Sequence, residues 1–115
     1  GKALLESMRL MDGKIIISVM RKREMDFFGV TTTDLDGIVS QLKLTEGVEV
    51  AIFLYEVGNM EFKASLRSKE QVDVSKVASY FGGGGHKKAA GFTMTGQPFD
   101  VLNNVSAQIV AQLEE

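Results

Sequence analysis

The stretch VEVAIFLYEVGNMEFKASLRS, residues 48–68, contains two strands and the turn that joins them. Residues 48–57 are apolar on both faces, as in a strand that is covered on both sides. Gly58 and Asn59 form a two-residue hairpin signal. In residues 60–68, the apolar side chains Phe62, Ala64 and Leu66 alternate with the polar side chains Glu61, Lys63, Ser65 and Arg67. The stretch therefore predicts a β-hairpin whose first strand is central in a sheet.

The segments on either side of this hairpin predict further strands and helices. Residues 14–20 and 90–95 have the pattern of strands. A first helix is predicted at 21–28, and a second runs from an N-cap at Thr33 to a stop before Gly47. A third helix follows an N-cap at Asp73, and a fourth begins near Pro98. The last of these has a predicted buried stripe of Phe99, Leu102, Val105, Ile109 and Leu113. Together these segments predict an α/β fold, with a mixed β-sheet of about five strands and helices on both faces.

The composition is that of one globular domain. The chain has 115 residues, of which 44% are hydrophobic and 24% charged. Its net charge of −2 excludes a globally basic nucleic-acid-binding protein, so an anion would need a local site. The chain has no cysteine, which excludes disulfides and thiolate metal sites and is compatible with a reducing compartment. No apolar run approaches the roughly 18 residues of a membrane span. We therefore expect a cytoplasmic protein with no membrane partner.

The N-terminal sequence GKALLESMRL has no initiator methionine. It is typical of a segment cut from a longer chain. We therefore expect residues 1–12 to be the end of an inter-domain connection and residues 13–115 to be one domain.

A glycine run interrupts the C-terminal half of the chain in the sequence FGGGGHKKAAGF, residues 81–92. Successive backbone N–H groups of glycines can form a concave nest that binds phosphate or carboxylate. His86 and Lys87 would add side-chain donors to such a nest. The run matches neither a Walker A loop nor the dinucleotide-binding fingerprint. A flexible connection explains the glycines equally well, and the residues alone do not decide between the two interpretations.

Arg67 is the second candidate for a binding role. A guanidinium can bind a phosphate in bidentate fashion or stack on a base. An arginine on a solvent-exposed strand face usually has no binding role. Here, however, only a short loop and one short helix separate the strand from the glycine run, so both could line a single crevice. One histidine and no cysteine provide neither a nucleophile triad nor a convincing metal-ligand set. We infer that the chain binds a ligand but does not catalyse a reaction alone.

The motif GGGGHKKAAGF, preceded by VDVSKVASYF and by the strand FKASLRS, resembles the DHH-associated C-terminal domain of DHH-family phosphoesterases. The most similar members are bacterial oligoribonucleases that also dephosphorylate 3′-phosphoadenosine 5′-phosphate. In such enzymes an N-terminal DHH domain holds two manganese ions on Asp and His ligands and performs hydrolysis. The associated domain binds the substrate across a cleft. The resemblance therefore implies that this chain is part of a hydrolase and is inactive without that domain.

The resemblance also implies a set of binding residues. The N–H groups of Gly83, Gly84 and Gly85 would bind a phosphate, to which His86 would also donate. Arg67 would contact a phosphate or a base, with Ser65 and Ser68 nearby. No catalytic residue, metal ligand or cofactor is expected in this chain, and manganese is expected in the missing domain. The expected partners are that N-terminal DHH domain and a short oligonucleotide or nucleotide.

Two alternatives remain at this point. In the first, the chain is a non-catalytic nucleic-acid-binding module, as in alanyl-tRNA synthetase. In the second, it is the matching domain of a different phosphoesterase, either a cyclic dinucleotide phosphodiesterase or an exopolyphosphatase. The negative net charge argues against tight binding of long nucleic acids, because contacts to the phosphate backbone dominate their affinity.

Overall fold

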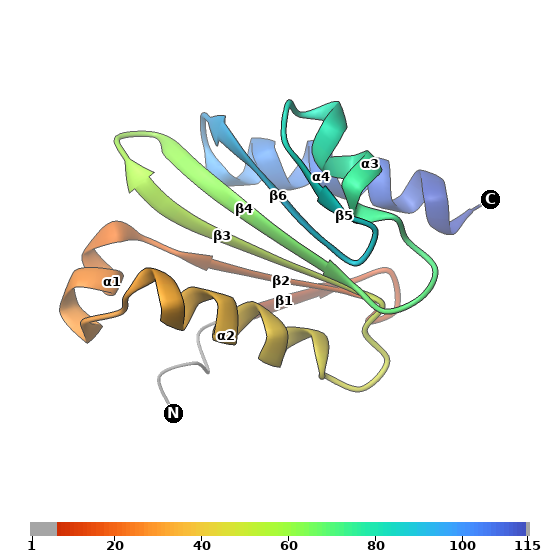
Figure 1. The fold of residues 1–115 in the computed structure, drawn as a ribbon, viewed down its shortest axis with the longest axis horizontal. Helices are drawn as coiled ribbons and strands as arrows, with labels where there is room; N and C mark the ends of the chain where they lie inside the picture. The colour runs from red at the N-terminus through yellow and green to blue at the C-terminus, as the bar shows by residue number, and fades with distance from the viewer. Residues whose placement is uncertain (1–6, 115) are drawn as a thin grey trace.

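A computed structural model describes residues 7–114, which form one mixed sheet with helices on both faces (Figure 1). The strands are β1 (Ser7–Leu10), β2 (Ile15–Met20), β3 (Val50–Gly58), β4 (Glu61–Ser68), β5 (Gly84–His86) and β6 (Ala89–Thr95), in the sheet order β1-β2-β3-β4-β6-β5. The helices are α1 (Lys22–Phe28), α2 (Thr32–Lys43), α3 (Val74–Tyr80) and α4 (Pro98–Leu113). Among these described strands, only β2 and β3 pair in parallel. The predicted α/β fold with a mixed sheet is confirmed, with six strands in place of about five.

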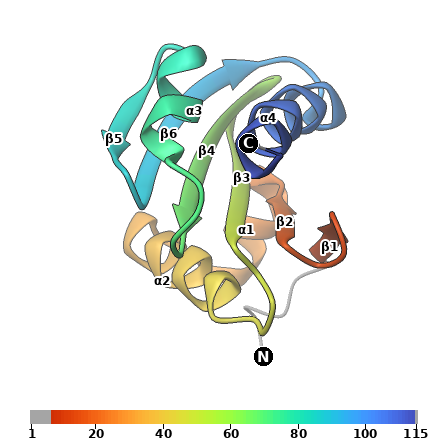
Figure 2. The same ribbon diagram turned by 90° about the vertical axis from the view of Figure 1, so that its right-hand side faces the viewer.

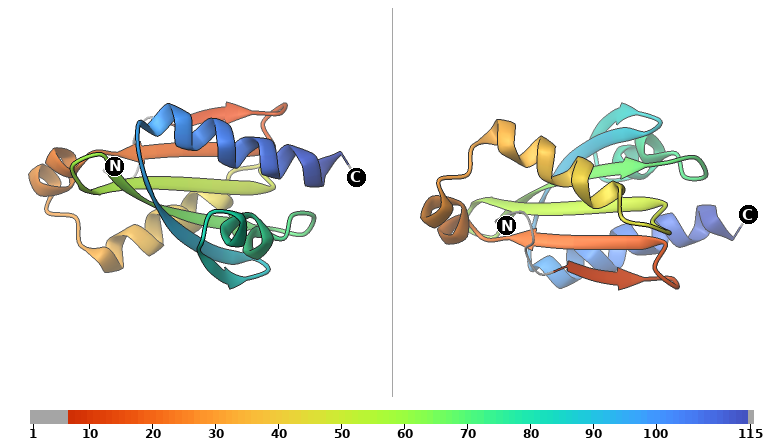
Figure 3. Two further views of the ribbon diagram at one scale, coloured as in Figure 1. Left: turned by 90° about the horizontal axis from the view of Figure 1, so that it is seen from above. Right: turned by 90° about the horizontal axis from the view of Figure 1, so that it is seen from below.

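The two faces of the sheet are covered unequally. Helices α3 and α4 lie in front of the sheet when it is viewed from above, and α2 lies in front when it is viewed from below (Figure 3). The core under α3 and α4 takes buried residues from β2, β3, β4 and β6. The core under α2 takes its sheet residues from β2 and β3, with none from β4, β5 or β6. Figure 2 shows the sheet as a twisted layer that extends past α2 on the β5 side. The helices of residues 7–114 therefore leave this part of the α2 face uncovered.

Both edge strands differ from the prediction. Strand β5 lies inside the glycine run, where glycine's low strand propensity hides it from sequence patterns. Strand β1 lies within the segment expected to be the end of an inter-domain connection, and it pairs with β2 from Ser7↔Ser18 to Leu10↔Ile15. Residues 1–6 of that segment lie outside the described residues, and the boundary at residue 12 stays a prediction.

Two helix details in the prediction are wrong. Helix α2 has its N-cap at Thr31, where the Thr31 N–H and hydroxyl donate to Asp34 Oδ2 at 2.9 and 3.0 Å. These bonds, first of all the one from the backbone N–H, lower the pKa of Asp34. In α4, the predicted core residue Phe99 is 69% exposed, whereas Val101 is buried. The other residues of the α4 stripe are fully or partly buried, so only the first turn was misassigned.

The connection from β4 to α3 is held by one buried carboxylate. Glu49 is 8% exposed, and its side chain accepts the backbone N–H groups of Glu70, Gln71 and Val72 at 2.8–3.2 Å. Asp73 then caps α3, as predicted, by accepting the N–H groups of Ser75 and Lys76. These bonds fix the start of α3, and therefore also the position of the glycine run that follows it.

Candidate functional site

Strands β4, β6 and β5 present three parallel rows of side chains on the face that α2 leaves open. Because paired residues of antiparallel strands point to the same side of the sheet, the register defines each row. The rows are Arg67–Ala89–His86, then Ser65–Gly91–Gly84, then Lys63–Thr93. Successive rows lie about 7 Å apart along the strands. The middle row has only small residues, and the outer rows have cations at β4.

A shallow groove of about 630 Å³ follows these rows. We call it the glycine groove. It is lined by Asp36 of α2, Tyr55 of β3, Lys63, Ala64, Ser65 and Arg67 of β4, Gly82, Gly83, Gly84 and Gly85 of the glycine run, and Ala89, Ala90, Gly91, Phe92 and Thr93 of β6. The structure thus brings together five of the seven predicted site residues: Ser65, Arg67, Gly83, Gly84 and Gly85.

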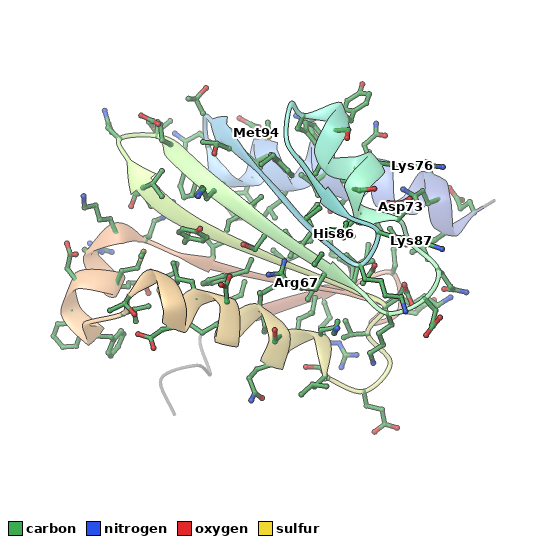
Figure 4. The ribbon with its side chains drawn as sticks, viewed as in Figure 1. Arg67, Asp73, Lys76, His86, Lys87 and Met94 are labelled. Carbon is green, nitrogen blue, oxygen red and sulfur yellow. The ribbon has the colours of Figure 1, made fainter. Side chains whose placement is uncertain are left out.

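Arg67 points into the space between β4 and α2 (Figure 4). Its guanidinium donates to the Leu66 carbonyl at 2.9 Å and lies 3.7 Å from the Asp36 carboxylate. The Arg67 side chain is 20% exposed and that of Asp36 is 76% exposed, so this ion pair adds little stability. Burial, and secondarily the Asp36 charge, raise the pKa of Tyr55, a buried residue that contributes to the lining of the groove. Arg67 is therefore oriented and accessible, and a ligand anion can replace Asp36 as its partner.

The glycine run begins with a helix-ending Schellman motif. Gly82 has a φ of +85° and its N–H donates to the Ser79 carbonyl, while the Gly83 N–H donates to the Ala78 carbonyl at 2.8 Å. The Gly83 N–H therefore already has a partner, unlike the free donor that the family resemblance implied. Gly84 and Gly85 continue into β5, the outermost strand on this side of the sheet. Because alternate N–H groups of an edge strand point away from the sheet, this part of the run can still offer a backbone donor.

Close packing against β6 explains why two of these residues are glycines. A Cβ atom added at Gly83 would lie 2.2 Å from the Gly91 carbonyl oxygen, and one added at Gly85 would lie 2.5 Å from Ala90 Cα. Gly84 differs, because a Cβ atom there would meet no atom within 4 Å. The run thus ends in a strand that packs closely on its neighbour, and Gly84 is the glycine of that strand that faces open space in the groove.

Two predicted site residues lie outside the lining of the groove. Ser68 is fully buried, and its hydroxyl donates to the Val72 carbonyl at 2.7 Å, so it stabilises the loop before α3. His86 is exposed at the end of β5, in the same row as Arg67, but does not line the groove. Sequence reasoning missed Asp36, Lys63 and Tyr55 as groove residues. For Lys63 a signal existed, because the strand alternation already placed it on the same face as Arg67.

The side chains of residues 7–114 do not fit a metal centre. In that part of the chain, no three His, Cys, Asp or Glu side chains gather closely enough to hold a metal ion. The same residues include no helix that is both long and apolar enough to span a membrane.

A mixed sheet with a glycine-containing edge strand and an arginine beside one open face defines an α/β domain with a candidate binding groove. Residues 12–114 match the DHHA1 domain family, and the chain belongs to this family. DHHA1 domains occur in DHH-family phosphoesterases, as the resemblance of the sequence implied. The chain is 37% identical over 67 residues to the bifunctional oligoribonuclease and PAP phosphatase NrnA of Thermus thermophilus. This match covers 58% of the chain and 20% of that protein, so the chain corresponds to only a part of that relative.

Solved structures with the same fold include an exopolyphosphatase-related protein from Bacteroides fragilis, with 26% identity and a TM-score of 0.79. The match covers 92% of this chain and 31% of that one. The C-Ala domain of Aquifex aeolicus alanyl-tRNA synthetase has 14% identity and a TM-score of 0.62, with 94% of this chain and 98% of that one covered. The pGpG-specific phosphodiesterase PggH from Vibrio cholerae has 12% identity and a TM-score of 0.61, with 92% and 36% covered. At these identities, the last two matches show a shared fold alone.

Proposed function

We propose that the chain is the substrate-binding domain of a two-domain, manganese-dependent phosphoesterase. Its substrates would be short oligoribonucleotides or nucleotides such as 3′-phosphoadenosine 5′-phosphate. An N-terminal DHH domain would supply the metal ions and the hydrolytic water, and this domain would hold the substrate phosphate. The relationship to the DHHA1 family and to NrnA supports the enzyme class.

The observation that carries the proposal is Arg67 beside an open row of Gly84, Gly91 and Ser65. The guanidinium can donate bidentate hydrogen bonds to two phosphate oxygens. The small residues beside it let a sugar or base approach the backbone of the sheet without a steric barrier. His86, in the row of Arg67, would contact the ligand from outside the groove.

Nucleotide titration of the purified chain tests this proposal. Adding AMP or 3′-phosphoadenosine 5′-phosphate should shift the amide resonances of Gly84 and Gly85 in a ¹H–¹⁵N spectrum. Replacing Arg67 with Ala should lower affinity about tenfold or more, because a hydrogen bond to a charged group contributes roughly 1.5–3 kcal/mol. His86→Ala should also weaken binding without unfolding the domain. Arg23→Ala, which changes an exposed arginine on α1 outside the groove, is the matched control and should have no effect.

The proposal fails if nucleotides shift no groove resonances, or if Arg67→Ala and Arg23→Ala behave alike. Binding of long single strands without binding of mono- or dinucleotides would instead support a nucleic-acid-binding module. The chain alone should not hydrolyse 3′-phosphoadenosine 5′-phosphate in the presence of manganese. Hydrolysis of this substrate by the highly purified chain would contradict the proposal that catalysis requires the N-terminal domain.

A further inference from the structure

The glycine groove has a second cation that no part of the proposed function uses. Lys63 lies on the same face of β4 as Arg67, at the opposite end of the groove. Its side chain is exposed, and it forms no ion pair with any residue between positions 7 and 114. Arg67, in contrast, is paired with Asp36. Lys63 is therefore the cation of the groove whose charge is not compensated by a neighbouring carboxylate.

The distance between these cations restricts what can contact both. Lys63 and Arg67 are four positions apart along β4, which corresponds to about 13 Å between their Cα atoms. The hydrogen bond to the Leu66 carbonyl keeps the guanidinium beside its own row, and Asp36 lies on the α2 side of it, so it does not extend along the strand toward Lys63. One phosphate bound at Arg67 therefore leaves Lys63 without an anion. A ligand that uses both must have two anionic groups some distance apart.

The surface between the two cations has room for a ring. The middle row consists of Ser65, Gly91 and Gly84, and a Cβ atom on Gly84 would meet nothing within 4 Å. At the Lys63 end, Tyr55 and Thr93 are its partners in the register of the neighbouring strands and add hydroxyl groups that can donate to phosphate oxygens. Along the groove, the cation of Arg67 is thus followed by the small residues of the middle row, and then by the cation of Lys63 with its neighbouring hydroxyl groups.

We propose that Lys63 binds a second phosphate of the ligand, one nucleoside away from the phosphate at Arg67. The groove then selects short oligonucleotides with two phosphates separated by a nucleoside, and binds mononucleotides less tightly. This inference rests on the proposed function, because it takes the phosphate at Arg67 as given. It adds a specificity-determining residue to that site.

Calorimetric titration with AMP and with the 5′-phosphorylated dinucleotide pApA tests the inference. The unaltered chain should bind pApA about fivefold more tightly than AMP, as expected for one added exposed ion pair at the upper end of the measured range. Lys63→Ala should remove this preference and change the affinity for AMP less than twofold. For pApA, the slope of log K against log salt concentration should be smaller in magnitude by about 0.7 for Lys63→Ala than for the unaltered chain. This is the value for one phosphate contact in a single strand.

Lys76→Ala is the matched control, because it removes an exposed lysine from α3, outside the groove. It should leave both affinities and the salt slope unchanged. Because the Lys63 side chain is exposed, the variant should keep the amide spectrum of the folded chain, which checks that its loss of affinity is not loss of structure.

Three results would overturn the inference. If Lys63→Ala weakens AMP and pApA equally, Lys63 contacts the same phosphate as Arg67. If it weakens neither, Lys63 is a solvated lysine. If tripolyphosphate binds as tightly as pApA with the same dependence on Lys63, the middle row holds no nucleoside. In all three cases AMP still binds in a manner that depends on Arg67, so the proposed function stands; loss of AMP binding to the unaltered chain would reject the proposed function itself.

Discussion

Alanine substitution of adjacent glycines should give opposite results at Gly83 and Gly84. The two substitutions are chemically identical and lie one residue apart, so the difference between them depends only on what each added Cβ atom meets. At Gly83 it would lie 2.2 Å from the Gly91 carbonyl oxygen and 2.5 Å from Phe92 Cβ. At Gly84 it would meet no atom within 4 Å, and the backbone there is outside the left-handed region.

The expected magnitudes follow from these contacts. At Gly83, strand β6 must move away, which disturbs the β5–β6 pairing and the stacking of Phe81 on Phe92 at a centroid distance of 4.9 Å. Overpacking of this kind costs about 1–3 kcal/mol of unfolding free energy. At Gly84, alanine restricts the unfolded chain and should stabilise the fold by about 0.4–1 kcal/mol. The two variants should therefore differ by about 1.4–4 kcal/mol.

Urea denaturation followed by far-ultraviolet circular dichroism measures this difference, because the linear extrapolation yields the unfolding free energy of each variant. The slope against urea should be the same for both variants and the unaltered chain, which shows that the denatured states are comparable. Equal stabilities for the two variants would refute the close packing of Gly83 on β6. A loss at Gly84 as large as that at Gly83 would refute the assignment of Gly84 to open space.

Three further predictions concern single carboxylates. Glu49→Gln should lower the unfolding free energy by about 1–3 kcal/mol in urea denaturation, because a neutral amide has one acceptor oxygen for three backbone N–H groups. Asp73 has a lowered pKa in the folded chain, mainly because the Ser75 hydroxyl donates to it. Its ionised form therefore stabilises the fold at any pH above the pKa of Asp73 in the unfolded chain, and this stabilisation is lost as the pH falls through the lower pKa of the folded chain. Asp73→Asn should therefore flatten the fall of the urea midpoint below about pH 4. Asp36→Asn should free Arg67 and raise the affinity for AMP about twofold to fivefold in calorimetry, and an unchanged affinity would show that the ion pair does not compete with the ligand.

Local patterns predicted most of the fold. The alternation in β4 gave the buried residues Phe62, Ala64 and Leu66, and apolar strands with capped helices gave the mixed sheet. The same alternation places Ser68 on the buried face, so its assignment to the site conflicted with the pattern from the start. Strand β5 could not be predicted, because its pairing depends on close contact with β6 and not on its own side chains.

The site could be predicted only in part, for a related reason. Arg67 and the glycines are near one another in the sequence, and the family motif includes both. Asp36 reaches the groove because α2 crosses the sheet beside β4, thirty-one residues earlier in the chain than Arg67. Juxtapositions of this kind arise from packing between distant segments, which periodicity within one segment does not encode.

The Schellman motif at the end of α3 has a consequence for the energetics of recognition. Four consecutive glycines would lose more backbone entropy than any other tetrapeptide if they became ordered on contact with a ligand. Here the Gly83 N–H is bonded to Ala78 and the next residues are paired with β6, so that loss occurs when the domain folds. The groove is thus preorganised, and the free energy of each encounter with a ligand does not include the ordering of this segment. Fast binding with little change in backbone order parameters is the expected signature of such a site.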